Sequence, residues 1–596
     1  MTETIAEILS AHRSRKTTPA ETVARTFARI RAHNDPAIFI SLRDEADAIA
    51  EAKAVDIGAP LAGVPVAVKD NIDVKGLPTT AACPAFAYQP GKDATVVARL
   101  RRAGAIVIGK TNLDQFATGL VGTRSPYGVP RNAIKPGLIP GGSSSGSAVA
   151  VAAGLVPLSL GTDTAGSGRV PAALNNIVGL KPSLGLVSTA GVVPACRTLD
   201  CVSVFSLTTD DSWAALSVMA GHDVADPYSR ARPLGGLQPM PAGLRLGVPL
   251  PGERLFFGDA RSAAGYEAAL ARFSRLGATI VEIDIEPFYE TARLLYEGPW
   301  VAERYIVARS LIASSPESLH PVTRQIILAG QHASAVDAFD ALYQLEDLRR
   351  VRDRTFETID ALLLPTMATA YTIDQVLEDP IGLNSRLGTY TNFVNLLDLC
   401  GLAVPASMRD DGIPFGVTLL APGGDDALLA SIGRVFHADT GLPLGALGAA
   451  QPPLAALPAT AGHDEIALAV VGAHLSGMPL NGEMTSLGAR LLETTTTAPD
   501  YRLFALNGST PPKPGLLRVA PGKGTPIELE VWALPTAKLG QFMAGVVAPL
   551  SIGTLTLADG RGVKGFLVEA EAIADAQDIS AFGGWRAFVA KATKTA

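Results

Sequence analysis

The hydrophobic and polar positions of the chain repeat with two periods, one typical of helices and one typical of strands. Residues 5–9 carry apolar side chains at helical spacing and predict a short amphipathic helix. Thr18 is the expected cap of a second helix, with Pro19 at its first position and Glu21 at its third. The chain therefore begins with two helices.

Short runs of Val, Ile, Leu and Ala then predict strands at 64–68, 105–108, 244–248, 279–283 and 361–364. Helical patterns lie between these runs, as at 94–103 and 265–276. Strands that alternate with helices are typical of an α/β sheet wrapped by helices. We expect this fold class for the larger, N-terminal part of the chain.

Two Gly/Ser-rich motifs interrupt the most apolar part of the chain, at 141–147 (GGSSSGS) and 161–169 (GTDTAGSGR). The apolar run 148–160 between them fits a buried element. Small residues on tight turns expose hydroxyls and backbone N–H groups, so this pattern can bring a serine nucleophile and oxyanion-binding amides together. Lys69, directly after the strand-like run 64–68, is a candidate base.

Three other interpretations of these motifs are weaker. Gly/Ser-rich segments are often linkers, but these two lie in an apolar, weakly charged region and lead into a strand and turn at 179–183. A phosphate-binding loop would need a Gly-Lys-Ser/Thr sequence, which does not follow. A Ser-His-Asp site would need a histidine, and none lies between His33 and His222; a G-x-S-x-G elbow is also missing.

On these residues the chain resembles the amidase signature family, whose members hydrolyse amides with a Ser–cis-Ser–Lys triad. The similarity runs from Pro65 to Pro182 and returns at 360–366 and 401–405. The resemblance implies a large mixed sheet wrapped by helices. It assigns the roles of nucleophile to Ser167, bridging serine to Ser143 and base to Lys69, with a cis peptide at Gly142–Ser143 and oxyanion-hole amides at Thr164, Ala165, Gly166 and Ser167. The separation of the two serines, 24 residues, matches the family.

The chemistry of this triad sets a condition on Lys69. Serine becomes a nucleophile only when a base takes its proton, and lysine can act as that base only when neutral. Because lysine normally titrates near 10.4, Lys69 must lie in a pocket that disfavours its charged form. The apolar approach at 64–68 suits such burial.

A boundary is predicted near residue 442. Residues 443–464 are mostly Ala, Pro, Leu and Gly, which is typical of a linker. We expect an amidase domain at 1–442 and a second domain at 465–596. Strand-like runs at 466–472, 502–506, 527–534 and 565–569 indicate a small α+β, barrel-like domain.

This combination of domains resembles the allophanate hydrolase family, on the tail sequence 471–481 and on the loop 163–171, where Ala165 and Gly168 replace the Gly and Ile of many amidases. The resemblance implies allophanate as the substrate and a γ-glutamylcyclotransferase-like C-terminal domain that assists decarboxylation. It also implies substrate contacts from Tyr296 and Arg304. We expect Gly119 and Gly122 to let a loop approach the substrate closely. Eight residues apart on one helix, Tyr296 and Arg304 would share a face, although a core tyrosine and a solvated arginine would have the same spacing.

His474 is the best polar candidate in the tail, because it follows an apolar run and begins a turn with glycine. A structural loop histidine remains an equal alternative. No metal or organic cofactor is expected, since the triad requires none.

Composition limits the partners. The chain of 596 residues has 50 Lys and Arg against 57 Asp and Glu, a net charge of −7 with no basic stripe for nucleic acid. Its 4 cysteines have neither metal nor disulfide spacing, no signal peptide is evident, and no apolar stretch is long enough to span a membrane. We expect a cytoplasmic enzyme, and the amidase resemblance implies a homodimer.

Two other functions stay open. The chain could be another amidase acting on a different small amide or in transamidation, or a binding protein that kept the fold. Loss of amide hydrolysis in Ser167→Ala would exclude the binding protein.

Overall fold

The computed structural model describes residues 3–232, 234–241, 243–455, 457, 460–462, 465–508 and 511–595. These residues cluster into two compact units, one of Met1–Leu234 and Pro239–Ala455, the other of Gly235–Gln238 and Ala456–Ala596. The predicted linker 443–464 contains positions 456, 458, 459, 463 and 464, which lie outside the described residues. Its first part packs on the larger unit, where Leu444 is buried and the Ala455 carbonyl accepts a hydrogen bond from Arg434 (2.7 Å).

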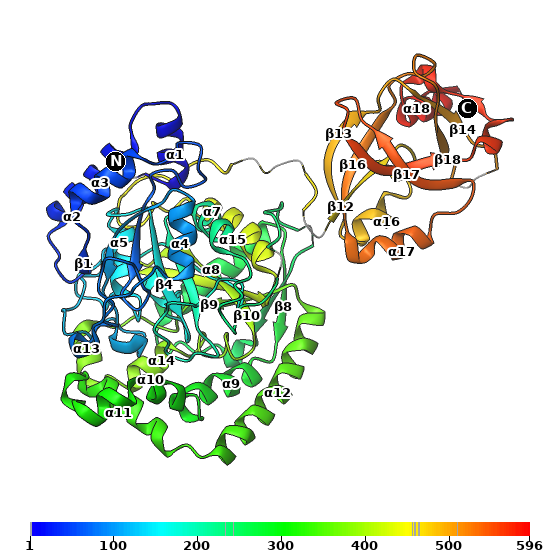
Figure 1. The fold of residues 1–596 in the computed structure, drawn as a ribbon. Helices are drawn as coiled ribbons and strands as arrows, with labels where there is room; N and C mark the ends of the chain where they lie inside the picture. Colours follow the sequence, from blue (N-terminus) through cyan, green and yellow to red (C-terminus); the bar gives the residue numbers. More distant parts are fainter. Residues whose placement is uncertain are drawn as a thin grey trace. The chain divides into compact units, whose positions relative to one another are not determined.

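The larger unit is built on one mixed sheet of 11 strands (Figure 1). In spatial order the strands are β1 (Phe39–Leu42), β3 (Ile106–Thr111), β2 (Pro65–Lys69), β4 (Leu158–Asp163), β6 (Cys201–Ser206), β5 (Val178–Lys181), β10 (Leu399–Met408), β11 (Pro414–Pro422), β9 (Ala361–Pro365), β7 (Arg245–Pro249) and β8 (Thr279–Ile283). Parallel pairs at β3–β2–β4 and β9–β7–β8 flank an antiparallel centre. The predicted α/β class and its five strands are confirmed.

Helices surround this sheet (Figure 1). They are α1 (Ile5–Arg13), α2 (Pro19–His33), α3 (Glu45–Lys53), α4 (Thr95–Arg102), α5 (Ser145–Ala152), α6 (Val170–Leu174), α7 (Thr209–Met219), α8 (Ala260–Arg275), α9 (Glu286–Glu297), α10 (Val301–Ser314), α11 (Pro321–Ala329), α12 (Ala335–Thr358), α13 (Ile373–Glu378), α14 (Gly382–Leu387) and α15 (Asp426–Thr440). The predicted start of α2 is confirmed, since Thr18 and Glu21 form a capping box.

One expectation needs correction. The apolar run 148–160 contains most of α5 and the start of β4, which are two elements and not one. Every residue of α5 is buried, so the helix has no face toward solvent. A helix that is buried all round shows no clear 3.6-residue hydrophobic period in the sequence, and its end is hidden from a pattern search.

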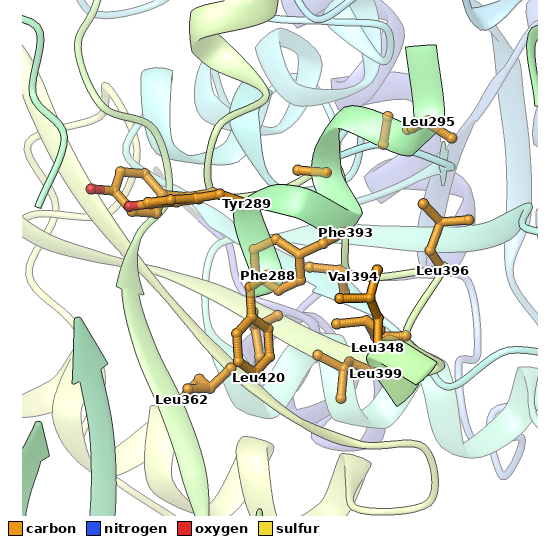
Figure 2. Close-up of a cluster of buried hydrophobic side chains, with 14 of the residues drawn as sticks. Phe288, Tyr289, Leu295, Leu348, Leu362, Phe393, Val394, Leu396, Leu399 and Leu420 are labelled. Atoms are coloured by element: carbon orange, nitrogen blue, oxygen red, sulfur yellow. The ribbon is translucent and has the colours of Figure 1, made fainter. Parts of the chain in front are cut away.

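A hydrophobic cluster beneath α9 and α12 supports the candidate site (Figure 2). Phe288 of α9 meets Phe393 edge to face, with ring centroids 5.4 Å apart. Ala165, from the second Gly/Ser motif, belongs to the same cluster, and Tyr296 packs against it. The loop that carries Ser167 is therefore seated on a packed core.

The smaller unit has a sheet of five strands, in the order β13 (Arg490–Thr496), β16 (Glu528–Pro535), β12 (Glu465–Val470), β18 (Gly562–Val568) and β17 (Leu550–Thr556). Beside it lie a sheet of β15 (Pro514–Arg518), β14 (Tyr501–Ala505) and β19 (Gln577–Asp578) and the helices α16 (Asn481–Ser486), α17 (Leu539–Ala544) and α18 (Trp585–Thr595).

The two edge strands of the five-stranded sheet come together just beyond their ends. Thr497 and Leu557 form an isolated bridge, and the amides of Ala498 and Ala558 donate to the carbonyls of Thr556 and Thr496 (2.9 Å each). This contact joins β13 to β17 and closes the sheet, as in a small barrel. The expected α+β, barrel-like domain is confirmed.

Candidate active site

Lys69 and the second Gly/Ser motif meet because β2 and β4 are parallel neighbours. Val68 lies opposite Leu160 in their register, so Lys69 at the end of β2 faces the segment that leads into the loop before Ser167. The ends of adjacent parallel strands reach the same edge of a sheet. At that edge the Lys69 Nζ atom lies 2.7 Å from Ser143 Oγ and 2.8 Å from Thr162 Oγ1.

Ser143 is held at the start of α5. The Gly142–Ser143 peptide is cis, as the resemblance implies. The Ser143 carbonyl accepts hydrogen bonds from the amides of Asp114 (3.0 Å) and Ser145 (2.9 Å). Ser144 Oγ donates to the Thr162 carbonyl (3.2 Å), which ties the helix start to β4.

The Lys69 side chain is completely buried. Burial lowers the pKa of its ammonium to about 7, although three buried carboxylates, Asp114, Asp163 and Asp200, act in the opposite direction. Near pH 7 a substantial fraction of Lys69 is therefore neutral and able to accept a proton. The electrostatic condition that the triad requires is present.

Ser167 is 3% exposed and stands between β4 and α6. In the described part of the chain, its hydroxyl forms no hydrogen bond with Ser143 or Lys69. The structure thus joins two members of the predicted triad directly and brings the third to the same edge. Catalytic hydrogen bonds are often long before a substrate is bound.

A buried ion pair shapes the loop that carries Ser167. The carboxylate of Asp163 accepts bonds from Arg169 Nε (2.9 Å) and Nη2 (3.0 Å) and from the amides of Gly166 (2.8 Å) and Gly168 (3.0 Å). The Gly166 amide is thereby engaged by a carboxylate. Among the described residues, the amides of Thr164, Ala165 and Ser167 donate to no protein acceptor, so no protein bond competes with a ligand for these three.

Tyr296 and Arg304 do not share a helix, in contrast to the expectation. Tyr296 lies near the end of α9 and Arg304 in α10, because Gly298 and Pro299 separate the two helices. The side chains still meet: Arg304 Nη2 donates to Tyr296 Oη (3.4 Å), and the guanidinium lies 5.4 Å from the centre of the tyrosine ring.

Arg304 is 2% exposed, and its charge contributes to the lowered pKa of Lys69. Its Nη1 atom donates to the Ala117 carbonyl (3.2 Å) and to Thr118 Oγ1 (3.1 Å), while its Nε atom has no partner. Within the described chain, no acidic side chain forms an ion pair with this guanidinium. Burial lowers the pKa of Arg304, but nearby groups that include Asp200 and Glu303 outweigh it and favour the charged form. A ligand carboxylate would add the direct ion pair that this guanidinium lacks.

Gly119 and Gly122 have positive φ values of 151° and 76°. A Cβ on Gly122 would lie 2.6 Å from the Gly141 carbonyl oxygen, and one on Gly119 would lie 2.8 Å from Asp114 Oδ2. Asp114 also accepts the Gly122 amide (2.9 Å). Both glycines thus allow a turn to close around the buried Asp114 carboxylate. This close packing within the protein is enough to require glycine at the two positions, without any contact to a substrate.

Sequence reasoning missed Thr162, Asp114 and Asp200. Thr162 stands inside a recognised motif, but only the pairing of β2 with β4 places it against Lys69. Asp200 accepts a hydrogen bond from the Thr164 hydroxyl, and burial raises its pKa to about 6. No local pattern marks either aspartate.

His474 lies in the smaller unit and is half-buried. Its Nε2 atom is 3.0 Å from Glu483 Oε2. Among the described residues, no cluster of three or more His, Cys, Asp or Glu side chains is arranged to hold a metal ion, and no helix is long and apolar enough to cross a membrane.

Residues 21–430 match the amidase family, and residues 466–590 match the allophanate hydrolase C-terminal domain. The chain therefore belongs to the amidase family and carries, in addition, a domain of the second family.

Among similar proteins, a urea amidolyase of Saccharomyces cerevisiae is 47% identical over 545 residues, which cover 89% of this chain and 30% of that protein. The chain thus spans about a third of the length of this urea amidolyase and of a second one from Lachancea kluyveri. An allophanate hydrolase structure from Kluyveromyces lactis is 42% identical, covers 99% of both chains and has a TM-score of 0.89. A glutamyl-tRNA(Gln) amidotransferase protein of Symbiobacterium thermophilum is 40% identical over 66% of this chain and 85% of its own length.

Proposed function

We propose that this chain hydrolyses allophanate, a small urea-like amide that bears a carboxylate. The observation that carries the proposal is the buried Arg304 guanidinium, which has a free Nε and no carboxylate partner in the described chain. It lies close enough to Lys69 to affect its pKa. A carboxylate on the substrate would supply an anion for it, and an arginine can hold a carboxylate with two parallel hydrogen bonds.

In the first step, neutral Lys69 accepts the proton of Ser143, and Ser143 accepts that of Ser167. The Ser167 oxygen attacks the terminal amide carbon, and the amides of Thr164, Ala165 and Ser167 stabilise the oxyanion. We assign Gly166 to loop anchoring, because its amide is engaged by Asp163. The proton returns through Ser143 to the leaving nitrogen, and ammonia departs.

In the second step, water attacks the acyl ester on Ser167, with the same serine and lysine as general base. The products are free enzyme and N-carboxycarbamate. Through both steps Arg304 and Tyr296 hold the substrate carboxylate, which positions the carbonyl carbon over Ser167. Gly119 and Gly122 contribute to substrate binding by holding the adjacent turn.

We further propose that the smaller unit promotes decarboxylation of N-carboxycarbamate to carbamate, with His474 as the proton donor. Its support is the similarity of residues 466–590 to the allophanate hydrolase C-terminal domain and the position of His474 in a cavity with Glu483. Carbamate then decomposes to a second ammonia and carbon dioxide.

Selectivity between allophanate and biuret tests this proposal. Biuret has the same skeleton, with a neutral amide in place of the carboxylate. The expected kcat/KM is about a hundredfold higher for allophanate, because biuret leaves the Arg304 charge unpaired. Arg304→Ala should remove most of this difference, and Arg309→Ala, on the same helix but exposed, should preserve it. Equal kcat/KM values for the two substrates in the wild-type protein would contradict the proposal.

We also propose a cytoplasmic homodimer. All four cysteines are free and buried, as is usual in a reducing compartment. The face of α12 exposes Val336, Phe339, Leu342 and Tyr343 at 68%, 57%, 47% and 66%. Contiguous exposed apolar side chains favour a protein interface.

A further inference from the structure

The segment 388–398, between α14 and β10, is bonded to the second Gly/Ser motif. Two of its polar side chains, Thr391 and Asn395, are completely buried. Thr391 Oγ1 donates a hydrogen bond to the Ala165 carbonyl (2.7 Å), and Asn395 Nδ2 donates one to the Asp163 carbonyl (2.8 Å). Both side chains therefore hold the backbone of the motif by its carbonyl groups.

The same segment is anchored in the hydrophobic cluster beneath α9 and α12. Phe393, Val394 and Leu396 belong to that cluster (Figure 2). Phe393 also meets Phe288 of α9 edge to face. Close packing of this kind restricts movement, so the two polar side chains are carried by a fixed support.

Asn395 serves only as a donor. Its Nδ2 atom also donates to the Leu199 carbonyl (2.7 Å), while its buried Oδ1 atom has no hydrogen-bond partner. A buried acceptor without a partner costs free energy, which the two donated bonds offset. Leu199 precedes Asp200, whose carboxylate accepts the hydroxyl of Thr164. Asn395 therefore ties the motif to the segment that holds the Thr164 side chain.

The peptide plane shows which amide each bond controls. Because a peptide is planar, the carbonyl of one residue and the amide of the next turn together. The bond from Asn395 to the Asp163 carbonyl fixes the plane of the Thr164 amide, which donates to no acceptor among the described residues. Thr391 fixes the plane of the Gly166 amide, which is already engaged by a carboxylate. Of the two, only Asn395 controls an amide that is available to a ligand.

We propose that Asn395 is a positioning residue of the oxyanion hole, which directs the Thr164 amide at the oxyanion without touching the substrate. This inference rests on the proposed function, in which that amide stabilises the oxyanion formed when Ser167 attacks. A hydrogen bond to the carbonyl also polarises the peptide and strengthens its N–H group as a donor. Negative charge on the oxygen is greatest near the tetrahedral intermediate, so a misdirected amide slows the reaction more than it weakens substrate binding.

Asn395→Ala tests this role in the full-length protein, because it removes both donated bonds. The kcat for the first ammonia from allophanate should fall by about tenfold or more, with KM nearly unchanged. Inhibition by β-boronopropionate is the second measurement. This compound carries a carboxylate and a boron atom that adds to a serine hydroxyl as a tetrahedral anion, so its Ki should rise by about tenfold as well. A Ki does not depend on the fraction of protein that is folded.

Asn176→Ala is the matched control. Asn176 is also buried, donates to two carbonyls, those of Pro443 (2.9 Å) and Gly445 (3.0 Å), and has an Oδ1 atom without a partner. Its φ of 55° makes alanine unfavourable there as well. This variant should lose stability through the same two bonds and yet keep the wild-type kcat and Ki.

A wild-type Ki for β-boronopropionate in Asn395→Ala would overturn the inference. So would equal increases in Ki in the two variants, or a rise in KM without a loss of kcat in Asn395→Ala. Failure of the underlying function gives a different result, because the wild-type protein would then release no ammonia from allophanate.

Discussion

At the scale of single residues, the site depends on charges that the fold keeps out of water. Lys69 is fully buried near three carboxylates, and Arg304 is buried without an ion pair in the described chain. The first arrangement produces a neutral amine near pH 7, and the second produces a position that favours an anion. In the proposed mechanism they are the base and the group that binds the substrate's anion.

The pH dependence of kcat/KM for the first ammonia follows from Lys69. Its pKa is lowered to about 7, and only the neutral amine is active, so kcat/KM should rise tenfold per pH unit below 7 and level off above about 8. The Asp200→Asn variant removes a carboxylate that raises this pKa, and its midpoint should shift to lower pH. A profile that stays flat from pH 5 to 9 would contradict Lys69 as the base.

Thr162 provides a second test at this scale. Thr162→Val removes the hydroxyl 2.8 Å from Lys69 Nζ and should lower kcat by about tenfold, with KM nearly unchanged, because the amine loses one of the two groups that orient it. Thr418→Val, which removes a buried hydroxyl bonded to Thr366, is the control and should keep kcat within about twofold. Equal losses in the two variants would indicate a general packing effect.

Lys69, Ser143 and Ser167 could be proposed from the sequence because each stands in a short local motif. Thr162 could not, since its role depends on the pairing of β2 with β4. The contact between Tyr296 and Arg304 was predicted from a single shared helix, but the two residues lie on different helices. Gly298 and Pro299 between them already indicated a helix boundary, and tertiary packing brings the two side chains together.

At the scale of elements, the start of α5 and the turn before it are built by close backbone approach. A Cβ on Gly142 would lie 2.1 Å from Asp114 Oδ2 and 2.6 Å from the Gly122 amide nitrogen. Asp114 in turn accepts the amides of Val121, Gly122 and Arg124. Asp114 therefore holds the turn at 119–124 through its carboxylate and the Ser143 carbonyl through its backbone amide.

Gly142→Ala should accordingly displace Ser143 and abolish ammonia release, and it should lower the melting temperature by several degrees through a loss of about 1–3 kcal/mol. Gly137→Ala, at a site with no atom within 4 Å of the added Cβ, is the matched control. Activity and thermal unfolding by calorimetry measure both effects. A Gly142→Ala protein with normal activity would show that the close approach is not needed.

Element boundaries were predictable where a local signal exists. The capping-box residues Thr18 and Glu21 mark the start of α2 in the sequence. The predicted strands β7, β8 and β9 begin and end within one residue of the observed ones. The junction of α5 and β4 was not predictable, because both are fully buried and only tertiary packing divides the apolar run.

At the scale of the whole molecule, the two units divide the proposed chemistry, with hydrolysis of the amide in the larger unit and decarboxylation in the smaller one. The larger unit contains Ser167 and Lys69, and the smaller one contains His474. The tail and its strands could be recognised in the sequence. The closure of the β13–β17 edge could not, because it depends on a bridge between Thr497 and Leu557, 60 residues apart.

Self-association belongs to this scale. If α12 forms the interface, Phe339→Asp should convert the dimer to a monomer, because it buries a charge against apolar side chains. Light scattering after gel filtration gives the mass directly. Val224→Asp alters an apolar residue that is 92% exposed on a different segment, and it should leave the mass unchanged. A Phe339→Asp protein with wild-type mass would place the interface elsewhere.

The most direct test of the account is the count of ammonia released from allophanate by the purified protein and by Ser167→Ala. The wild-type protein should release two ammonia molecules and two molecules of carbon dioxide for each allophanate consumed, and Ser167→Ala should release none while keeping the same thermal stability. Ammonia release by Ser167→Ala at the wild-type rate, or the absence of any release by the wild-type protein, would contradict the account.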